Sequence, residues 1–453
     1  PGAAANIQIR NMGGNPLFII DGVPKDKTQF DNLAPNDVEA ITVLKDASAS
    51  IYGSRAANGV IIVTTKRGAI GQKSTINLDA YYGFQNWTRF PTVVNAYEWN
   101  LGKAEAEVNR NGTTAITQAE LDKYKAGTEY GYQSFDWYDF IIQPNSPQSN
   151  INLSASGGSD KINYYISATR LDQNSVMGRE FLFNRSNIQS NIDAQITDRI
   201  KVGLTIAGRQ ETRKNPGVPG GDDYVAPKFA ILRNRPGERP FANDNPDYIN
   251  TISNPASNWG YLNYKRSGFL EEVYSSITPQ FTGEYRTPIK GLSVKALYSY
   301  MFRDSQREVF EYTYDTYTYN PTTQVYTRTG GSQNPYRQRV VNKIDENIGQ
   351  LQLHYTNTFG KHTVTAIALT ERLRKRERNV EARTVPKTNT LPVMQFADIV
   401  AYNDADFTQA RVGYIGRVNY GYADKYFVEV AARRDASWKF SPAKRWGTFP
   451  SVS

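Results

Sequence analysis

The stretch from Ile188 to Ile206, IQSNIDAQITDRIKVGLTI, decides the fold class of this chain. Apolar side chains recur with a period of two around a Thr197-Asp198-Arg199 turn: Ile188, Ile192, Ala194 and Ile196 precede it, and Ile200, Val202, Leu204 and Ile206 follow it. Since successive side chains of a β-strand point to opposite faces, the stretch predicts a hairpin with one apolar face. Pairing Ile196 with Ile200 brings Ala194 opposite Val202 and Ile192 opposite Leu204, which keeps the apolar faces together.

The same alternation continues through most of the chain after Gly71. One-sided apolar sets occur at Ile76–Phe84, Ile151–Ala155, Ile162–Ala168, Leu292–Tyr300, Leu351–Tyr355, Val412–Tyr420 and Val428–Val430. The phase is ambiguous only from Thr363 to Glu371, where both faces carry apolar side chains. The pattern predicts about eleven antiparallel strands of about eleven residues each, which is the length that crosses a bilayer at a tilt.

The predicted connections alternate in length along the chain. Short turns fall near residues 158–160, 197–199, 287–291, 360–362 and 423–425. Longer connections fall near residues 86–148, 172–184, 211–272, 304–345 and 376–410. Long loops are uncommon in compact domains, whereas short turns at one end and long loops at the other are typical of outer-membrane barrels.

The polar face of these strands has the composition of a wet interior. The side chains predicted to point inward are Lys201, Thr205, Arg209, Lys295, Gln350, Gln352, His354, Arg417, Asn419, Glu429 and Arg433. A soluble sheet with its apolar face on a core explains the alternation equally well. It does not explain such long strands separated by such long loops, so we favour a transmembrane β-barrel.

The amino-acid composition excludes several classes of function. The 453 residues include thirty tyrosines, two histidines and no cysteine, and the formal net charge is +9. The missing cysteine excludes disulfides, thiolate metal sites and cysteine nucleophiles. Lys and Arg are dispersed rather than clustered on one helix, which disfavours nucleic acid as a partner. No signal peptide is present, and we expect both ends to be cut from a longer chain.

The first seventy residues predict a small α/β unit rather than barrel strands. Buried strands are predicted at Pro16–Asp21, Asp37–Leu44 and Val60–Thr65. Asp46 is predicted to cap a short helix from Ala47 to Tyr52, with Gly53 as its left-handed stop.

Three stretches resemble one family. These are PLFIIDGVP at 16–24, NDVEAITVLKDASASIYGSRAANGVIIVTTKRG at 36–68 and DKYFVEVAARRDASWKFSPAKRWGTFPSVS at 424–453. The first two are similar to the plug domain of TonB-dependent receptors, and more narrowly to the SusC/RagA-type transporters of Bacteroidetes. The plug-motif residues are Asp21, Gly22, Lys45, Asp46, Tyr52, Gly53, Asn58 and Gly59, for which capping and tight turns are the expected role. The chain departs from the family pattern at Asn11 and Ala436, which leaves local loop geometry open.

The resemblance implies a division into the C-terminal part of a plug, residues 1–70, and the N-terminal half of a barrel, residues 71–453, with about half of about twenty-two strands. It implies TonB-dependent, energised import of oligosaccharides or peptides across a Gram-negative, Bacteroidetes-like outer membrane. The implied partners are a SusD-like lipoprotein lid, TonB through a segment not in this chain, outer-membrane lipid and the imported nutrient.

Two other functions remain open at this point. One is a TonB-dependent receptor for a siderophore or vitamin, and the other is a secreted carbohydrate-binding β-protein. An enzyme is less favoured, because His354 and His362 lie far apart and no catalytic, nucleotide-binding or metal-ligating motif is present. We therefore expect no cofactor. Asp21, Asp26 and Asp31 lack the spacing of a calcium loop and are interpreted as turn residues.

Aromatic residues in the long loops are the candidates for contact with a ligand or a lid. They are Trp87, Trp99, Trp137, Trp259, Tyr314 and Tyr317, with loop packing or an ordinary tyrosine-rich hairpin as the alternative. The charged run from Glu371 to Arg378, ERLRKRER, is a second candidate, for lipid phosphates. A solvated extension of a strand is the favoured interpretation of that run.

Overall fold

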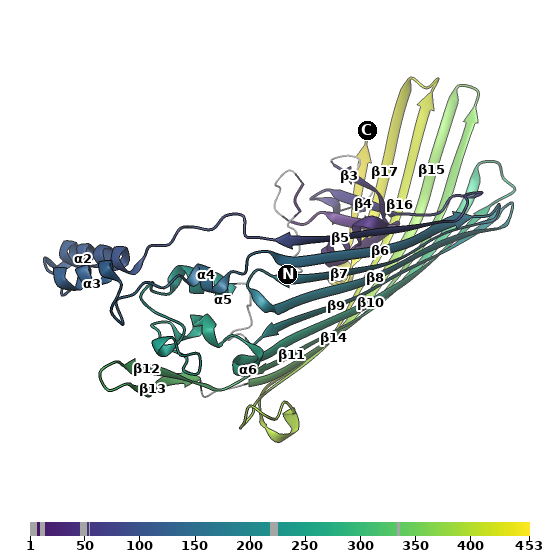
Figure 1. Ribbon diagram of the computed structural model, residues 1–453. Coiled ribbons are helices and arrows are strands. Elements are labelled where there is room, and N and C mark those ends of the chain that lie inside the picture. Colours follow the sequence, from purple (N-terminus) through teal and green to yellow (C-terminus); the bar gives the residue numbers. More distant parts are fainter. Residues whose placement is uncertain (1–6, 10–13, 46–51, 54, 218–224, 333–335) are drawn as a thin grey trace.

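The fold comprises a small four-stranded sheet followed by a large curved one (Figure 1). The computed structural model describes residues 7–9, 14–45, 52–53, 55–217, 225–332 and 336–453. A two-stranded hairpin and several short helices gather at one end of the large sheet, and tight turns lie at the other end. None of the helices in these residues is both long and apolar enough to cross a membrane.

The small sheet has the strand order β2-β1-β4-β3. Its elements are β1 (Leu17–Ile20), β2 (Val23–Lys25), α1 (Lys27–Asp31), the 3-10 turn η1 (Pro35–Asp37), β3 (Val38–Leu44) and β4 (Val60–Thr65). β1 and β4 pair in parallel and bury Phe18 and Val63, which confirms two of the three predicted buried strands. The prediction for β3 was wrong in one respect: it is an edge strand, and Ile41 is 55% exposed.

A tight turn joins β1 to β2. Asp21 and Gly22 both have positive φ, 47° and 84°, which is the backbone of the two-residue hairpin turn that favours Asp-Gly. The turn tip points toward the large sheet, because Leu297 of that sheet lies 3.8 Å from where a Cβ on Gly22 would stand.

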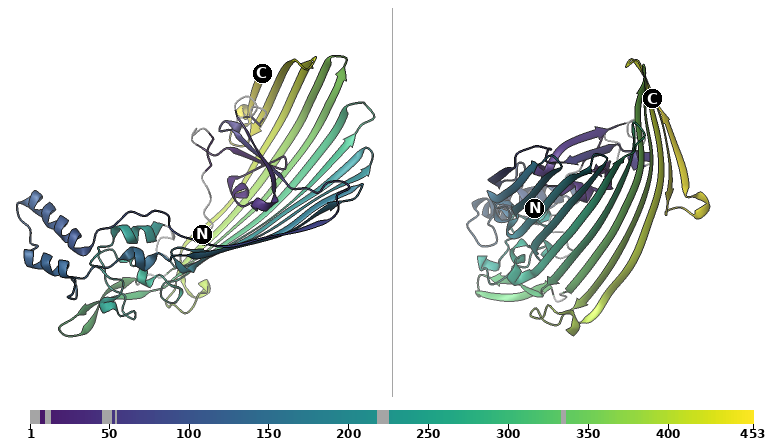
Figure 2. Two further views of the ribbon diagram at one scale, coloured as in Figure 1. Left: turned by 45° about the horizontal axis from the view of Figure 1, so that its top comes forward. Right: turned by 90° about the vertical axis from the view of Figure 1, so that its right-hand side faces the viewer.

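The large sheet contains twelve antiparallel strands, one more than the estimate from the sequence. They are β5 (Thr75–Gln85), β6 (Ser146–Gly158), β7 (Ile162–Ser175), β8 (Gly178–Thr197), β9 (Ile200–Pro216), β10 (Gly268–Arg286), β11 (Leu292–Glu311), β14 (Tyr336–Phe359), β15 (His362–Val385), β16 (Asp398–Tyr422), β17 (Tyr426–Ser437) and β18 (Trp446–Val452). Neighbours in the sheet are neighbours in the chain, except where the β12–β13 hairpin intervenes between β11 and β14. The sheet curves around the small unit (Figure 2).

The register of β8 and β9 confirms most of the predicted hairpin. Ala194 lies opposite Val202 and Ile192 lies opposite Leu204. Ile196 does not pair with Ile200, because a register shift between Gln195 and Thr197 places Thr197 there instead. A bulge inserts one residue without reversing the faces beyond it, so the apolar set stays on one side.

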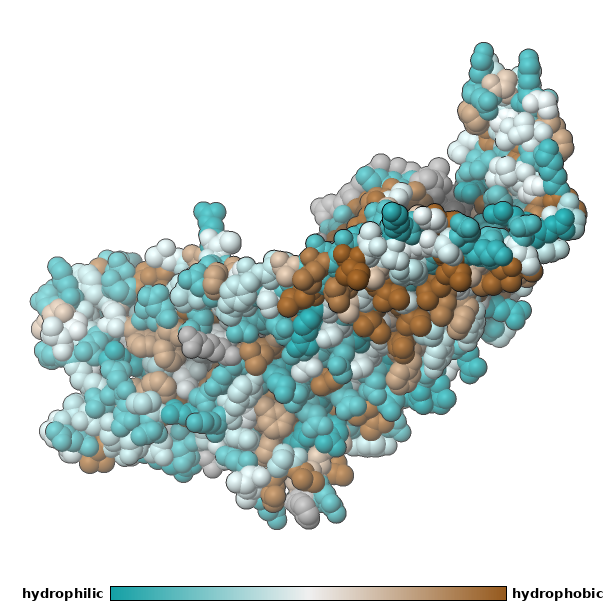
Figure 3. All heavy atoms as spheres, turned by 45° about the vertical axis from the view of Figure 1, so that its right-hand side comes forward, coloured by the Kyte–Doolittle hydropathy of each residue, from teal (hydrophilic) through white to brown (hydrophobic). Residues whose placement is uncertain are grey.

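That apolar side of the sheet faces outward and is uncovered. Ile151, Ile188, Leu353 and Val418 are 52%, 53%, 48% and 46% exposed. Hydrophobic residues form a diagonal band across the visible face of the molecule, bordered by hydrophilic ones (Figure 3). So much contiguous apolar surface is exceptional for a soluble monomer and favours contact with lipid.

All five predicted short turns are confirmed, and one predicted long connection is not. β7 and β8 are joined by Val176 and Met177 alone, since both strands extend through residues 172–184. Other strands are also longer than expected: β14 and β15 have 24 residues each, and β16 has 25. The charged run from Glu371 to Arg378 lies inside β15, so the prediction that it belongs to a strand is confirmed.

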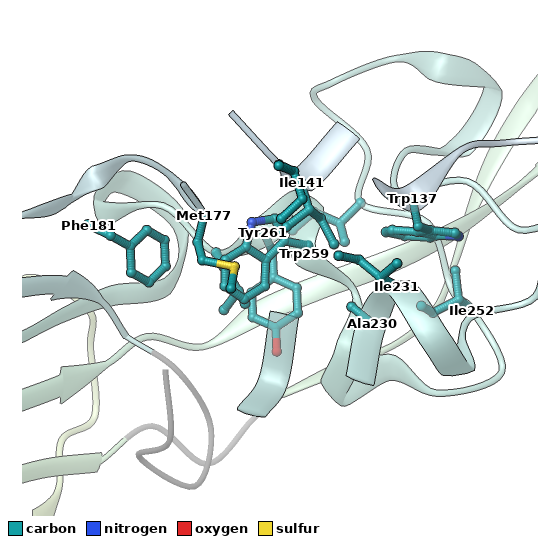
Figure 4. Close-up of a cluster of buried hydrophobic side chains, with 12 residues drawn as sticks. Trp137, Ile141, Met177, Phe181, Ala230, Ile231, Ile252, Trp259 and Tyr261 are labelled. Carbon is teal, nitrogen blue, oxygen red and sulfur yellow. The ribbon is translucent and has the colours of Figure 1, made fainter. Parts of the chain in front are cut away.

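The long connections fold into a layer of their own. They carry α2 (Ala96–Asn111), α3 (Gln118–Ala126), α4 (Trp137–Ile141), α5 (Val225–Arg233), α6 (Tyr264–Ser267), β12 (Tyr314–Asn320), β13 (Val325–Ser332) and the 3-10 turns η3 (Ala242–Asp244), η4 (Pro255–Ser257), η5 (Trp259–Tyr261), η6 (Met394–Phe396) and η7 (Pro442–Lys444). β12 and β13 form the tyrosine-rich hairpin predicted as the alternative to a ligand wall. Trp137, Ile231 and Trp259 meet in a shared core (Figure 4).

Candidate functional site: the interface between plug and wall

The small unit, here called the plug, comprises the described residues 14–45, 52–53 and 55–67. It rests on the polar face of the large sheet, here called the wall. Side chains of wall strands β7, β8, β9, β10, β11, β14, β15 and β17 bind it or surround the groups that do. The inward-facing residues Arg209 and Gln350 donate to backbone oxygens of Thr28 and Gly22 in the plug. The polar face therefore surrounds the plug, while the apolar face points away from it.

The Asp21-Gly22 turn is held from two sides. Thr65 donates to Asp21 through its backbone N–H at 3.0 Å and its hydroxyl at 2.7 Å, which ties the turn to β4. Gln280 of the wall donates to the Asp21 carbonyl at 3.0 Å. Asn191 of β8 donates to the Thr65 hydroxyl at 2.8 Å and to the Lys66 carbonyl at 2.6 Å. The three bonds from the wall join neutral groups, so each one stabilises the seated plug modestly.

Asp37 is a buried carboxyl at the plug surface, 3% exposed. Its Oδ1 accepts hydrogen bonds from the Tyr165 hydroxyl at 2.9 Å and the Ser167 hydroxyl at 2.5 Å, both on β7. Burial raises the pKa of Asp37, and the two hydroxyl donors oppose that rise. The docked plug thus holds a proton on this carboxyl more readily than an undocked plug would.

An ionic cluster joins the plug to β15 and β17. Arg55 of the plug lies 2.7 Å from Glu371, and Arg433 lies 3.4 Å from the same carboxylate and 2.8 Å from Asp435. Gly53 lies against this cluster with φ of 68°, and a Cβ there would stand 2.6 Å from Asp435 Oδ2. The left-handed backbone predicted for Gly53 is present, and its lack of a side chain also permits the close approach.

A partly open space of about 740 Å³ lies between plug and wall. It is lined by Lys25 and Asp37 from the plug and by Arg209 and Gln280 from the wall. The Lys25 ammonium is buried and has no hydrogen-bond partner among the residues that the structure describes. Burial lowers its pKa against the opposing influence of Glu346 and Asp26. A polar interface with such spaces is suited to separate, because water can take over the bonds that are lost.

Tyr52, Gly59 and Asn58 contact other residues of the plug. Tyr52 packs beside the Ile19–Val60 cluster, and Gly59 has φ of 86° with Ile9 and the Leu44 carbonyl close by. Asn58 donates weakly to the Asn15 carbonyl at 3.5 Å, and Lys45 is exposed where β3 ends. The cap predicted at Asp46 and the helix from Ala47 lie outside the described residues.

The three aspartates considered for calcium have separate tasks. Asp21 holds β4, Asp26 caps α1 by accepting from the Gln29 backbone, and Asp31 pairs with Lys27. Among the residues that the structure describes, no group of three histidine or acidic side chains is arranged to hold a metal ion.

The loop aromatics are divided between a core and an open hollow. Trp137 and Trp259 are 2% and 7% exposed inside the loop core, which favours packing as their role (Figure 4). Trp87 is half-buried at the edge of that core. Trp99 lies on α2, half-buried, with the Arg235 guanidinium 5.4 Å from its ring.

Tyr314 and Tyr317 line an open hollow of about 1020 Å³ in the loop layer. Lys265, Arg266, Asp247, Asp315, Ile249, Thr313 and Asn389 complete its lining. One face of the Tyr314 ring stacks on Tyr261 at 4.1 Å between centroids. Of the six aromatic candidates, these two are the pair that the fold brings to one accessible surface.

Sequence reasoning missed Asp37, Asn191 and Tyr165 as contact residues. The alternation already placed Asn191 on the polar face of its strand, which was a usable signal. Tyr165 and Ser167 were equally assignable to the inner face of β7. Asp37 carried no signal, because its partners lie 128 and 130 positions away in the chain.

The class defined by this geometry is a plug seated on the polar side of a curved, lipid-exposed antiparallel sheet. A family model described as the TonB-dependent receptor plug domain matches residues 1–60. TonB-dependent receptor P3 of Formosa agariphila is 29% identical over all of this chain and 42% of its own length. TonB-dependent receptor SusC of Bacteroides thetaiotaomicron is 26% identical over all of this chain and 45% of its own length.

Solved structures show the same fold. A structure of the RagAB peptide transporter superposes with a TM-score of 0.77 at 24% identity, covering 96% of this chain and 50% of that one. Along its whole length the chain is similar to TonB-dependent receptors that include SusC, and its first sixty residues match their plug domain. It spans somewhat under half the length of the curated relatives named above.

We expect plug docking to depend on pH through Asp37. Because its pKa is raised in the docked state, its contribution is greatest below the ordinary carboxyl value and declines as the pH rises through the raised value. Urea titrations monitored on the plug should therefore show tighter docking near the ordinary carboxyl pKa, at about pH 4, than at neutral pH. Asp37→Asn should reduce that difference, whereas Glu39→Gln on the exposed edge strand should not. An unchanged pH dependence in Asp37→Asn contradicts this assignment.

Trp137→Ala should loosen the loop layer without unfolding the wall. Removing a fully buried tryptophan costs about 3–5 kcal/mol, and here the loss is confined to the loop core. We expect amide exchange to accelerate in residues 137–142 and 248–262 while exchange in β8 and β9 stays slow. Trp99→Ala, at a half-buried position on α2, serves as the control with a smaller effect.

Proposed function

We propose that this chain takes part in the TonB-dependent import of large nutrients across a bacterial outer membrane. The observation that carries the proposal is the plug held by polar contacts on the inner face of a sheet whose outer face is apolar and exposed. Water and plug on one face and lipid on the other are what an outer-membrane barrel requires. The matches to TonB-dependent receptors support the energy source.

We further propose the division at residue 70, with the plug before it and barrel strands after it. The described strands support the boundary, because the small sheet ends at Thr65 and the large one begins at Thr75. Residues 66–74 contact both parts: the Lys66 backbone N–H donates to the Asp37 carbonyl of the plug at 2.8 Å, and Arg67 pairs with Asp193 of the wall at 3.0 Å.

Oligosaccharides or peptides are the proposed cargo, with a SusD-like lipoprotein as a lid over the loop layer. The relatives that cover the whole chain are SusC and similar receptors, and RagAB is a peptide transporter. Tyr314 and Tyr317, which face an open hollow among charged and polar side chains, are the proposed contact residues. Trp87 and Trp99 are retained as weaker candidates at the edge of the loop layer.

Movement of the plug, rather than bond cleavage, is the proposed chemistry. TonB would pull on a segment in front of the plug, and the plug contacts would be exchanged for water. The rival import of a siderophore or vitamin is weaker, because the vitamin B12 transporter BtuB of Vibrio vulnificus aligns with 47% of this chain at 23% identity.

Isolation of the receptor with its neighbours in the membrane tests this function. We expect an affinity-tagged receptor, solubilised from outer membranes, to carry a lipoprotein in roughly equal amount. Cells lacking the receptor gene should lose growth on one oligosaccharide or peptide mixture and keep growth on siderophores and vitamin B12. Recovery in the soluble fraction would instead support a secreted carbohydrate-binding protein, and a siderophore or vitamin defect would support the rival.

A further inference from the structure

Four outward-facing positions in succession on β15 are arginines. Arg372, Arg374, Arg376 and Arg378 alternate with inward-facing residues such as Glu371, which contacts the plug. The outward direction is fixed by the register, because Ala368 of the same set lies opposite the exposed Leu353 of β14. The outward-facing residues of β15 change from uncharged to charged at Arg372, because the preceding ones are Val364, Ala366, Ala368 and Thr370.

Two of these arginines are already neutralised and two are not. Arg376 pairs with Asp406, and Arg378 pairs with Asp345. Arg372 and Arg374 are exposed and make no hydrogen bond or ion pair within the described part of the chain. Cross-strand neighbours of this pair are uncharged, namely Gly349 and Val412 for Arg372, and Asn347 and Ala410 for Arg374. Two adjacent free guanidinium groups about 7 Å apart along a strand make a local anion site.

An apolar groove of about 780 Å³ lies beside the arginines on the same outer face. Its floor is made of short side chains at Ala366, Ala368 and Gly416, and its sides include Leu353, Val418 and Val430. The register places Ala368 beside Gly416 and Ala366 beside Val418, four to eight residues before the free arginines. A lipid acyl chain lying in the groove would end about 13 Å short of Arg372. The arginine side chain and a lipid headgroup together can span that distance.

The position along the strand fits the outer boundary of the membrane. Arg372 is eleven residues beyond the tight turn at Lys361, or about 37 Å along a strand. At a tilt of about 40° this corresponds to roughly 28 Å across the bilayer, close to the height of the apolar band of such barrels. The arginines lie toward the end that carries the long loops.

We propose that this face of β14, β15 and β16 is a binding site for a phosphorylated lipid of the outer leaflet. The phosphate would bind between Arg372 and Arg374, and an acyl chain would lie in the groove over Ala368 and Gly416. Guanidinium groups are the preferred partners of phosphate, and aliphatic chains fill grooves between larger apolar side chains. The inference rests on the proposed outer-membrane barrel and adds a ligand to its outside.

Native mass spectrometry of the receptor purified from outer membranes in mild detergent tests the site. We expect phosphorylated lipid to remain bound to the wild type and to fall roughly thirtyfold in affinity in Arg372→Gln/Arg374→Gln, about fivefold for each basic residue. Lys361→Gln/Lys425→Gln, which removes two charges at the tight-turn end of the same strands, should retain the lipid. Equal lipid on all three proteins overturns the proposal.

A groove-filling variant separates lipid from free phosphate. Ala368→Trp keeps both arginines but occupies the groove, so it should lose the lipid. Millimolar inorganic phosphate should not displace lipid from the wild type. Displacement by phosphate, or full lipid binding by Ala368→Trp, overturns the assignment to a lipid.

Recovery in the membrane fraction distinguishes the two proposals. A receptor absent from outer membranes contradicts the proposed function, whereas a membrane-inserted receptor without bound phosphorylated lipid contradicts only this inference.

Discussion

Glu371→Ala should weaken plug docking more than any other single change in the wall. Glu371 is 7% exposed, and its carboxylate accepts hydrogen bonds from both Arg55 and Arg433. Arg433 is itself 4% exposed. Removing the carboxylate takes one partner from the buried Arg433 guanidinium, which keeps Asp435, and leaves the half-buried Arg55 guanidinium without this partner. Breaking a buried pair costs about 3–5 kcal/mol. We expect faster amide exchange in β1 and β4 of the plug and a lower thermal midpoint.

Asp406→Ala is the matched control on the neighbouring strand. Asp406 pairs with Arg376, but both side chains are nearly half exposed, at 46% and 47%. Exposed pairs contribute about 0–1 kcal/mol, so this variant should leave plug exchange unchanged. An effect of Glu371→Ala no larger than that of Asp406→Ala would show that the ionic cluster does not stabilise the docked plug.

Leu353→Arg should block insertion of the wall into a membrane, whereas Gln352→Arg should not. Leu353 lies on the outer face, 48% exposed, and Gln352 lines a hollow on the plug side together with Arg67 and Asp193. An arginine facing lipid near the midplane costs about 2–4 kcal/mol, while one facing the lumen remains hydrated. Heat-modifiable migration of receptor folded into vesicles measures the inserted fraction. Equal insertion of the two variants contradicts the inside-outside assignment.

The period-two pattern of apolar and polar residues was enough to predict the sheet and its two faces. The spacing of these segments predicted the succession of short turns and long loops. The period-two pattern assigned Thr205, Arg209 and Gln350 to the inner side because a period of two leaves no other arrangement once one face is apolar. It failed at Ile196, where a bulge depends on local twist rather than on hydropathy. It also failed for residues 172–184, because strand extensions above a membrane are polar on both faces and resemble loops in sequence.

The plug–wall contacts were less predictable than the sheet. The plug strands β1 and β4 follow from short apolar runs, but the exposure of β3 depends on what lies beside it. The orientation of the plug on the concave face of the sheet decides which wall residues contact Asp37 and Arg55. No local sequence pattern encodes this orientation. The loop core was equally hard to predict. Trp137 and Trp259 are far apart in sequence, and the sequence alone fits both ligand contact and loop packing for them.

Labelling of single cysteines along β14 tests the central claim most directly, since the chain contains no cysteine of its own. Substitutions at 350, 351, 352 and 353 would be probed in intact membranes with a lipid-soluble and a water-soluble maleimide. We predict that 351 and 353 react from the lipid and that 350 and 352 react only from water, more slowly while the plug is in place. Lipid-side reaction at 350 and 352, or identical labelling at all four positions, would contradict a sheet with the plug and water on one face and lipid on the other.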